Sequence, residues 1–215
     1  MHSVLDERVP SFNFVVFVEL SLGSEHTMLA KPDGTVWAAG VNTFGQLGTD
    51  SRKSITISNF VKVMCGDAKA VAAGDGHSMV LEQDGSVWST GMNKRGQLGD
   101  GSNTDRHVFV QAISSYAKAV AAGAEHSLVV MRDGSVCATG YNLHGQLGDG
   151  STTDRNRFFQ VISGGAEAVA AGSGHSMMLK QDGSVWGTGE NEYGQLGDGS
   201  VCPKSSFIQV ILSGG

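Results

Sequence analysis

Short apolar segments separated by turn-forming residues run along most of the chain, and the stretch 70–113 shows the arrangement most clearly. Its apolar segments are AVAAG at 70–74, HSMVL at 77–81, SVWSTG at 86–91 and FVQAI at 109–113. Turn signals every ~8–12 residues, without an amphipathic helical pattern, are typical of all-β proteins. We therefore expect four short strands here, and the small residues of AVAAG suit a crowded inner position.

Asp84-Gly85 separates the second expected strand from the third. Asp-Gly is a strong hairpin signal, because glycine accepts the positive φ that a tight hairpin turn needs. The third strand would therefore return antiparallel to the second. A loop containing Gly-Gln-Leu-Gly follows, and the polar run DGSNTDR at 100–106 leads to the fourth strand.

This unit occurs four times in register. Gly-Gln-Leu-Gly recurs at 45–48, 96–99, 145–148 and 194–197, so successive copies lie 51, 49 and 49 residues apart. A histidine keeps the same spacing, at His26, His77, His126 and His175. A further motif reads DGTVW at 33–37, DGSVW at 84–88, DGSVC at 133–137 and DGSVW at 182–186. Four-stranded units repeated every ~40–50 residues are typical of propeller blades.

The order AVAAG, His-Ser, Asp-Gly-Ser-Val-Trp, Asn and Gly-Gln-Leu-Gly resembles the repeat of the regulator of chromosome condensation family, over roughly residues 20 to 212. The resemblance implies a β-propeller, and members of that family usually carry seven blades. The predicted fold class is therefore all-β: a partial or small β-propeller built of four-stranded antiparallel blades, with about four repeats. Three arrangements remain open: a piece of a longer propeller, an open arc completed by itself or a partner, and a compact four-blade ring.

The repeat register predicts one propeller-type domain. We expect its blades at 20–69, 70–118, 119–167 and 168–215. The N-terminal segment 1–19 matches no copy well, although Phe14 to Leu20 suits an extra strand.

Composition and charge argue against several classes of protein. Lys and Arg number 15 against 21 Asp and Glu, a net charge of -6, so charge alone predicts no nucleic-acid partner. The 3 cysteines form no CxxC, which argues against a disulfide framework or a zinc ribbon. The most apolar stretch, Phe12 to Leu22, is about half the ~20 residues that a membrane helix needs. Because no targeting signal is recognisable, the cytoplasm or the nucleus is the default expectation.

The four register histidines could converge around a ring as metal ligands. No acidic residue keeps a matching register beside them, however, and a feature present in every blade is usually structural. We expect each histidine to cap the first hairpin of its blade by bonding to backbone. We expect no metal and no cofactor.

The runs DGSNTD at 100–105 and DGSTTD at 149–154 place oxygens at alternate positions, as a calcium loop does. An EF-hand loop needs Gly at its sixth position and Glu at its twelfth, and neither run has them. We therefore expect capped turns, with surface ion pairs within Asp105/Arg106 and Asp154/Arg155.

Trp37, Trp88 and Trp186 share one repeat position, where the third copy has Cys137. A repeated Val-Trp on a strand favours blade packing. The motif Gly-Trp-Arg-His-Thr, implied by the plant UV-B receptor of the family, does not occur. The sequence also has no Gly-x-Ser-x-Gly elbow and no Walker loop, so we assign no catalytic residue and do not expect an enzyme.

Positions that the repeat leaves free are better candidates for binding. The pairs between the Asn and Gly-Gln-Leu-Gly differ from copy to copy, and they include aromatic and basic residues, the types that anchor interfaces. We predict that a protein partner is bound by residues from these pairs, namely Phe44, Lys94, Arg95, Leu143, His144, Glu192 and Tyr193.

The leading hypothesis is a non-enzymatic protein–protein interaction module or scaffold that uses the loops on a propeller rim. The resemblance implies an alternative, a guanine-nucleotide exchange factor for a Ran-like small GTPase, but the regular spacing leaves no room for the β-wedge that the founding member inserts. A third hypothesis is a structural subunit that completes a ring or larger assembly, because end blades would leave strand edges unpaired. It predicts a homo-oligomer or larger assembly through the end blades.

Overall fold

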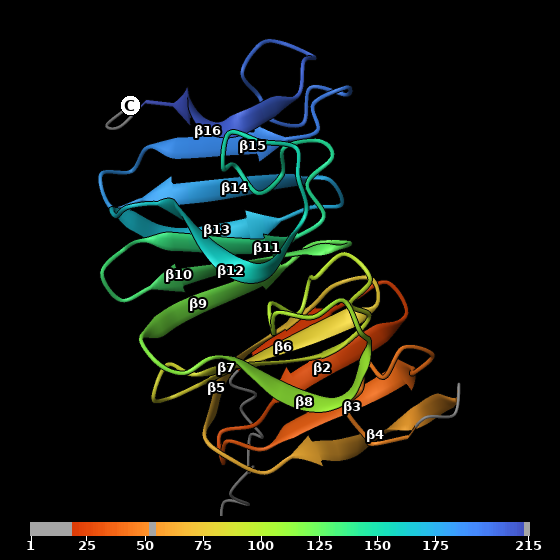
Figure 1. The fold of residues 1–215 in the computed structure, drawn as a ribbon. Coiled ribbons are helices and arrows are strands. Elements are labelled where there is room, and N and C mark those ends of the chain that lie inside the picture. The colour runs from red at the N-terminus through yellow and green to blue at the C-terminus, as the bar shows by residue number, and fades with distance from the viewer. Residues whose placement is uncertain (1–18, 52–54, 213–215) are drawn as a thin grey trace, which may run out of the picture.

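The computed structural model describes residues 19–51 and 55–212, which form four antiparallel sheets of four consecutive strands each (Figure 1). The first sheet holds β1 (Glu19–Leu22), β2 (His26–Ala30), β3 (Val36–Val41) and β4 (Thr56–Met64). The second holds β5 (Ala68–Ala73), β6 (His77–Glu82), β7 (Val87–Gly91) and β8 (Arg106–Ile113). The third holds β9 (Ala117–Ala122), β10 (His126–Met131), β11 (Val136–Gly140) and β12 (Arg155–Ile162). The fourth holds β13 (Ala166–Ala171), β14 (His175–Lys180), β15 (Val185–Gly189) and β16 (Lys204–Ile211).

These sheets are the four blades, and the predicted all-β class is confirmed. β1 contains Glu19 and Leu20 from the expected strand Phe14 to Leu20, whereas 14–18 lie outside the described residues. The described part of the chain forms no helix, and so none that could cross a membrane.

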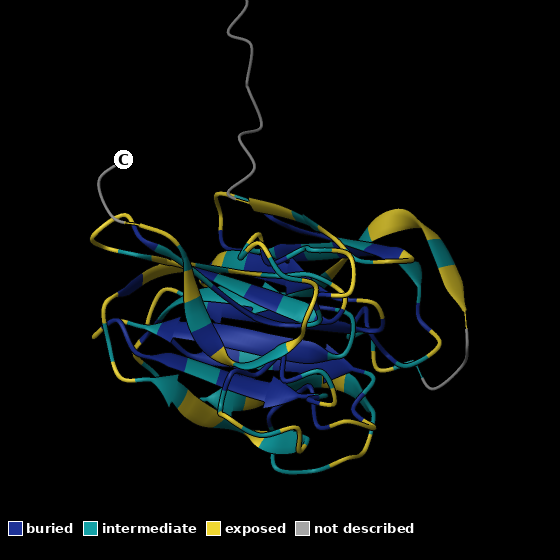
Figure 2. Cartoon of the chain, turned by 90° about the horizontal axis from the view of Figure 1, so that it is seen from above, coloured by how far each residue is buried: buried dark blue, intermediate teal, exposed yellow. Residues whose placement is uncertain are grey.

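The blades follow one another from red to blue in Figure 1, and their first strands touch in series: β1 with β5, β5 with β9, and β9 with β13. The first strands therefore lie along a shared inner side. A hollow of about 200 Å³ there is lined by residues from all four blades. Buried residues gather on the second and third strands, and exposed ones on loops and outer strands (Figure 2).

The predicted Asp-Gly turn joins the second strand to the third in every blade. Gly85 adopts φ 88°, and the Asp84 carboxylate accepts a hydrogen bond from the Ser86 N–H at 2.7 Å. The Gly85 carbonyl accepts the N–H of Ala117, the first residue of β9, at 2.9 Å. The turn that closes one hairpin therefore also positions the next blade.

A glycine three residues before each register histidine allows neighbouring blades to approach closely. A β-carbon on Gly74 would collide with the Gly123 carbonyl oxygen in the next blade and with the ring of His77. Gly23 has the same surroundings one blade earlier. The spacing Gly-x-x-His therefore reflects a contact between blades that no larger residue would allow.

The histidines bond across the junctions between blades. Nε2 of His26 lies 2.7 Å from the hydroxyl of Ser78 in the next blade, and this hydroxyl lies 2.7 Å from the Gln46 carbonyl oxygen. The same chain joins His77, Ser127 and Gln97, and again His126, Ser176 and Gln146. Because serine has one hydroxyl hydrogen, which goes to the carbonyl, the histidine Nε2 carries a proton and donates it.

The expectation that each histidine side chain caps the first hairpin of its own blade is therefore wrong. A backbone bond does close that hairpin end, but it runs from the Gly23 N–H to the carbonyl of His26, at 2.9 Å. The imidazole instead crosses to the following blade. The histidines are structural, as expected, and they connect blades rather than cap a turn.

Blade four has no following blade among the described residues. The ring of His175 is partly exposed and has no serine partner there. Leu179 is 41% exposed, whereas Leu81 and Val130 at the same repeat position are 0% exposed. Among the described strands, no junction of comparable extent joins blade four to blade one. The described residues thus form an open arc, and the compact four-blade ring is wrong for them.

Replacing His77 by alanine should destabilise the protein by about 2–4 kcal/mol, because it opens a buried cavity and removes the bond to Ser127. The matched control, His175→Ala, removes the same side chain at the open end and should cost about 1 kcal/mol or less. Urea unfolding followed by tryptophan fluorescence measures both. Equal losses in the free energy of unfolding would show that the bond between blades does not contribute to stability.

Candidate functional site

The four Gly-Gln-Leu-Gly loops lie at one end of the blades, where the third strands finish. We call this end the loop face; it comprises residues 42–51, 93–105, 142–154 and 191–203. Asn93 holds one such loop: its Oδ1 accepts the N–H of buried Leu98 at 3.0 Å, and its Nδ2 lies 3.1 Å from Asp100 Oδ1. Asn42, Asn142 and Asn191 make the same bond to their own leucines. The loop backbones are therefore fixed before any partner arrives.

The predicted binding residues fall into two groups according to their place in each pair. The first members of the pairs, Lys94, Leu143 and Glu192, are exposed, and Leu143 is 60% exposed. The second members are Phe44, Arg95, His144 and Tyr193. Each donates its backbone N–H to the glutamine side chain two residues on.

Two of these second members contact the next blade. The ring of Phe44 lies beside Gly76, where an added β-carbon would be 3.1 Å away. Arg95 lies 3.5 Å from Asp154 and 4.0 Å from Glu125 in blade three. Phe44 and Arg95 therefore contribute to blade junctions as well as to the surface. Tyr193 belongs to blade four, which no further blade follows in the described part of the chain, and it is 87% exposed.

Arg95 and His144 meet around Tyr141, a residue that the sequence reasoning missed. The Arg95 guanidinium lies 4.7 Å from the Tyr141 ring centroid, and His144 packs edge-on against the same ring, with centroids 6.0 Å apart. The equivalent positions hold Val41, Met92 and Glu190. This variation between copies is the same signal that selected the pairs, so the sequence did carry it.

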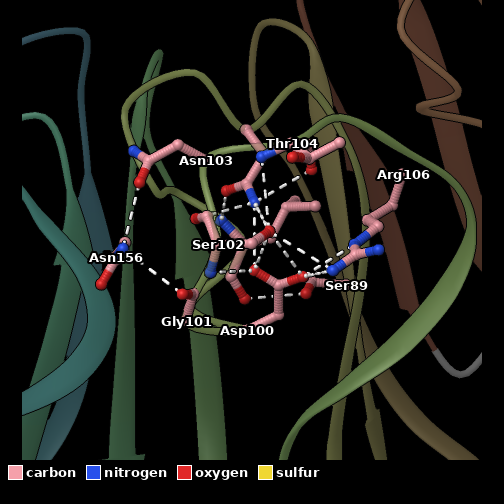
Figure 3. A network of polar contacts seen from close by, with 10 residues as sticks. Ser89, Asp100, Gly101, Ser102, Asn103, Thr104, Arg106 and Asn156 are labelled. Carbon is pink, nitrogen blue, oxygen red and sulfur yellow. Dashed lines mark hydrogen bonds and ion pairs between the residues drawn. The ribbon is translucent and has the colours of Figure 1, made fainter.

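Two hollows open on either side of Asn103. One, of about 530 Å³, is lined by Arg95 and by residues of blade three; the other, of about 620 Å³, is lined by Lys94 and by residues 103–108. The Asn103 side chain donates to the Lys94 carbonyl at 3.2 Å. It accepts a hydrogen bond from the Asn156 side chain at 3.0 Å (Figure 3). A fixed polar partition therefore separates two shallow recesses on the loop face.

Beneath the partition, Asp100 organises a polar network (Figure 3). Its carboxylate accepts from the Ser102 N–H at 2.9 Å and pairs with Arg106 at 2.6 Å. Burial opposes ionisation, but these hydrogen bonds outweigh it and lower the pKa of Asp100. Asp149 and Arg155 repeat the pair at 2.8 Å.

The expected ion pairs between adjacent residues are therefore wrong. Arg106 and Arg155 reach back six residues to the buried Asp100 and Asp149 instead. The Asp105 carboxylate accepts the N–H of Asn93 at 2.8 Å and so helps to hold the loop together. Because the oxygens of these runs bond to the chain itself, the turns are capped, as expected. No cluster of three or more metal-binding side chains occurs within 19–51 and 55–212.

Comparison with known families decides the identity of the repeat. One model of the regulator of chromosome condensation (RCC1) repeat matches residues 33–81 and 84–130, and a second matches 68–97, 117–146 and 166–195. Together they cover well over half of the chain.

The chain belongs to the RCC1-repeat family. The resemblance inferred from the repeated motifs is thus confirmed. Among curated relatives, the human X-linked retinitis pigmentosa GTPase regulator is 36% identical over 93 residues, 43% of this chain and 9% of that protein. The Protein RCC2 homolog of Xenopus laevis is 38% identical over 81 residues, 37% of this chain and 16% of that protein. The matches thus span only a small part of these relatives.

Solved structures show the same RCC1-type fold. Human WBSCR16 superposes with a TM-score of 0.80 at 25% identity, over 94% of this chain and 56% of that one. Yeast RCC1 (Prp20), solved bound to Kap60, superposes with a TM-score of 0.80 at 22% identity, over 95% of this chain and 51% of that one. This RCC1-repeat chain therefore spans about half the length of both.

The junction histidines of this RCC1-repeat protein are held neutral. Burial lowers the pKa of His26 and of His126 to about 4. Burial, with smaller effects from the other two histidines, lowers the pKa of His77 to about 3. An unfolded histidine has a pKa of about 6.5, so the unfolded chain takes up protons first as the pH falls.

Stability should therefore be complete above pH ~6.5 and should fall between there and pH ~4. At pH 5 the loss should be about 2 kcal/mol for each junction histidine, because unfolded rings protonate while folded ones stay neutral. The urea midpoint at pH 7, 6 and 5 measures it, and His126→Gln should reduce the slope by about a third. A midpoint that does not change with pH would contradict neutral histidines at the junctions.

Proposed function

We propose that this protein is a non-enzymatic interaction module that binds a protein partner on the loop face. The observation that carries the proposal is the exposure of Leu143, at 60%, and Tyr193, at 87%, on loops whose backbones are fixed by side-chain hydrogen bonds. Loops that are already fixed lose little backbone conformational entropy on binding. Lys94 and Arg95 add positive charge on the neighbouring loop of blade two.

Proteins of the same fold support the choice of a protein partner. Yeast RCC1 (Prp20) was solved bound to Kap60, and a second Prp20p structure is described together with its binding to Gsp1p and histones. Identity of 22–23% to this chain carries over the fold alone. We extend to this chain only the use of a propeller surface for protein binding.

Leu143→Asp and Tyr193→Ala should each weaken binding of the partner by about 10-fold or more, as loss of an interface anchor does. A photo-crosslinking residue at position 143 of the full chain would capture the partner, and the Kd of the purified partner would then be measured. The matched control is Ile211→Ala, which alters a residue 58% exposed at the opposite end of blade four.

Unchanged affinity in both loop-face variants would contradict the proposed site. Capture of a Ran-like GTPase whose nucleotide release the protein accelerates would favour the exchange-factor alternative instead. The repeat spacing of 49 residues through blades two to four argues against that outcome, because it provides no inserted wedge.

A second candidate function, a structural subunit that pairs with another copy, is favoured by complementary end faces. Within the arc, a β-carbon on Gly99 would collide with the ring of Phe158 in the next blade, and Gly148 meets Phe207 in the same way. Among the described residues, a β-carbon on Gly197 of blade four would meet nothing within 4 Å. Phe60, which holds the position of Phe158 in blade one, is 44% exposed. In the described residues, no phenylalanine ring thus packs against the loop of blade four, and the Phe60 ring of blade one is not covered by a loop.

Light scattering during gel filtration should then give a mass approaching twice 22.4 kDa as concentration rises. The contact between two copies would be weaker than the junctions between blades of one chain. In blade two the Thr90 hydroxyl donates to the Gly45 carbonyl of blade one, and the equivalent residue of blade one is Ala39, which has no hydroxyl. Phe60→Asp should return the mass to the monomer, and Tyr116→Asp, away from both ends, should not. A constant mass of 22.4 kDa up to high concentration would exclude this candidate.

A further inference from the structure

The third blade lacks a tryptophan that the other three use in the same way. The indole Nε1 of Trp37 donates to the hydroxyl of Thr35 at 3.0 Å, and that of Trp186 donates to Ser184 at 2.9 Å. Trp88 bonds to Ser86 at 3.1 Å. The equivalent position of blade three is occupied by Cys137, so the hydroxyl of Ser135 accepts no indole N–H.

The residue beside the indole also differs between blades, and in blade two it is Glu82, whose carboxylate accepts the Trp88 indole N–H at 3.1 Å. The ammonium of Lys31 lies 3.8 Å from the Trp37 ring centroid, and that of Lys180 lies 4.1 Å from the Trp186 centroid. Blade three has Met131 at this repeat position. A thioether is uncharged and polarizable, and it packs favourably against aromatic rings.

The missing indole leaves an open pocket of about 560 Å³. It is lined by Tyr116, Met131, Ser135, Cys137 and Gln160, together with the charged residues Arg132 and Asp133. It lies at the Asp-Gly end of blade three, the end opposite to the loop face. Apolar walls with a few convergent polar groups are the usual composition of a binding pocket.

Tyr116 stands at the mouth of this pocket in a strained conformation. Its φ is 69°, a left-handed value that side-chain-bearing residues rarely adopt, and its side chain is 66% exposed. The same repeat position in blade four is Gly165, with φ 83°. A hydrogen bond from the Arg132 N–H to the Tyr116 carbonyl, at 2.7 Å, fixes the backbone here. A strained, exposed aromatic residue beside a pocket is typical of a functional position.

We propose that this pocket binds the side chain of a tryptophan from a partner protein. The indole would lie over Cys137, on the side of the sheet that Trp88 and Trp186 cover in neighbouring blades, with its N–H directed to the Ser135 hydroxyl and its ring between Met131 and Tyr116. The chain itself provides the precedent, because each of the other three blades holds an indole at the equivalent position. This site goes beyond the loop face and does not depend on it.

The probe is N-acetyl-L-tryptophanamide, titrated into the ¹⁵N-labelled full chain and followed by NMR chemical shifts. We expect shifts confined to residues 116, 131–137 and 160, with a Kd on the order of 1 mM, as suits so small a molecule. N-acetyl-L-leucinamide, which has no N–H donor on its side chain, should bind at least ~10-fold more weakly.

Three variants test the geometry. Cys137→Trp restores the residue of the other blades, should keep or raise the melting temperature, and should abolish binding. Ser135→Ala should weaken binding by about 5-fold, whereas the matched Ser86→Ala in blade two should leave it unchanged. Tyr116→Gly should keep or raise the melting temperature while weakening binding, because glycine relieves the left-handed strain.

Absence of binding, or binding that Cys137→Trp leaves intact, would overturn the proposal. If Cys137→Trp does not fold, equal affinities of Ser135→Ala and the unaltered chain would overturn it. Binding of free indole but not of N-acetyl-L-tryptophanamide would also overturn it, because the pocket would then take a small molecule rather than a protein side chain. Leu143→Asp should bind the probe normally, so failure here and failure on the loop face are distinguishable.

Discussion

The hydrogen-bond chain from histidine to serine to glutamine carbonyl is the constraint on which the other features depend. It needs a neutral imidazole with its proton on Nε2, because the hydroxyl hydrogen of Ser127 is already committed to the Gln97 carbonyl. It also needs glycine beside the ring, where the blades approach most closely. One arrangement, repeated three times along the described chain, fixes the spacing of the blades and therefore the curve of the arc. Nδ1 of each ring stays buried without a partner, which makes a protonated ring still more costly.

The loop face depends on the same junctions. The carbonyl that accepts each serine hydroxyl belongs to the Gly-Gln-Leu-Gly loop of the preceding blade. In the loop of blade one, the Gly45 carbonyl also accepts the Thr90 hydroxyl of blade two, at 2.9 Å. Each loop is therefore built by one blade and held by the next. Within 19–51 and 55–212 no further blade supports the loop of blade four, and Tyr193 on it is 87% exposed whereas Phe44 is half-buried. The same loops therefore form both the proposed binding surface and part of the junctions between blades. Arg95, for example, contributes to both.

The strands, the Asp-Gly turns and the repeat family could all be predicted from the sequence, because each is encoded within one copy of the repeat. The sequence alone could not show which residues of one copy contact which residues of another, or of their own loop. His77 bonds to Ser127, 50 residues away, and Arg106 bonds to Asp100 rather than to the adjacent Asp105. A repeat period tells which residues are equivalent, but it does not tell which of them are neighbours. The positions of the predicted binding residues, split between solvent and junction, depend on the same missing information.

Departures from the repeat carry information only when their three-dimensional neighbours are known. Cys137 is visible in the sequence as an exception among tryptophans, and taken alone it indicates only weaker packing. In the structure it belongs to a group with Met131, Ser135 and Tyr116 around one pocket. Random loss of a tryptophan would not account for a left-handed tyrosine at the mouth of the pocket, where glycine stands one blade later. Because strain at a solvent-exposed side chain costs stability and brings no packing, Tyr116 is better explained by something that it contacts outside the chain.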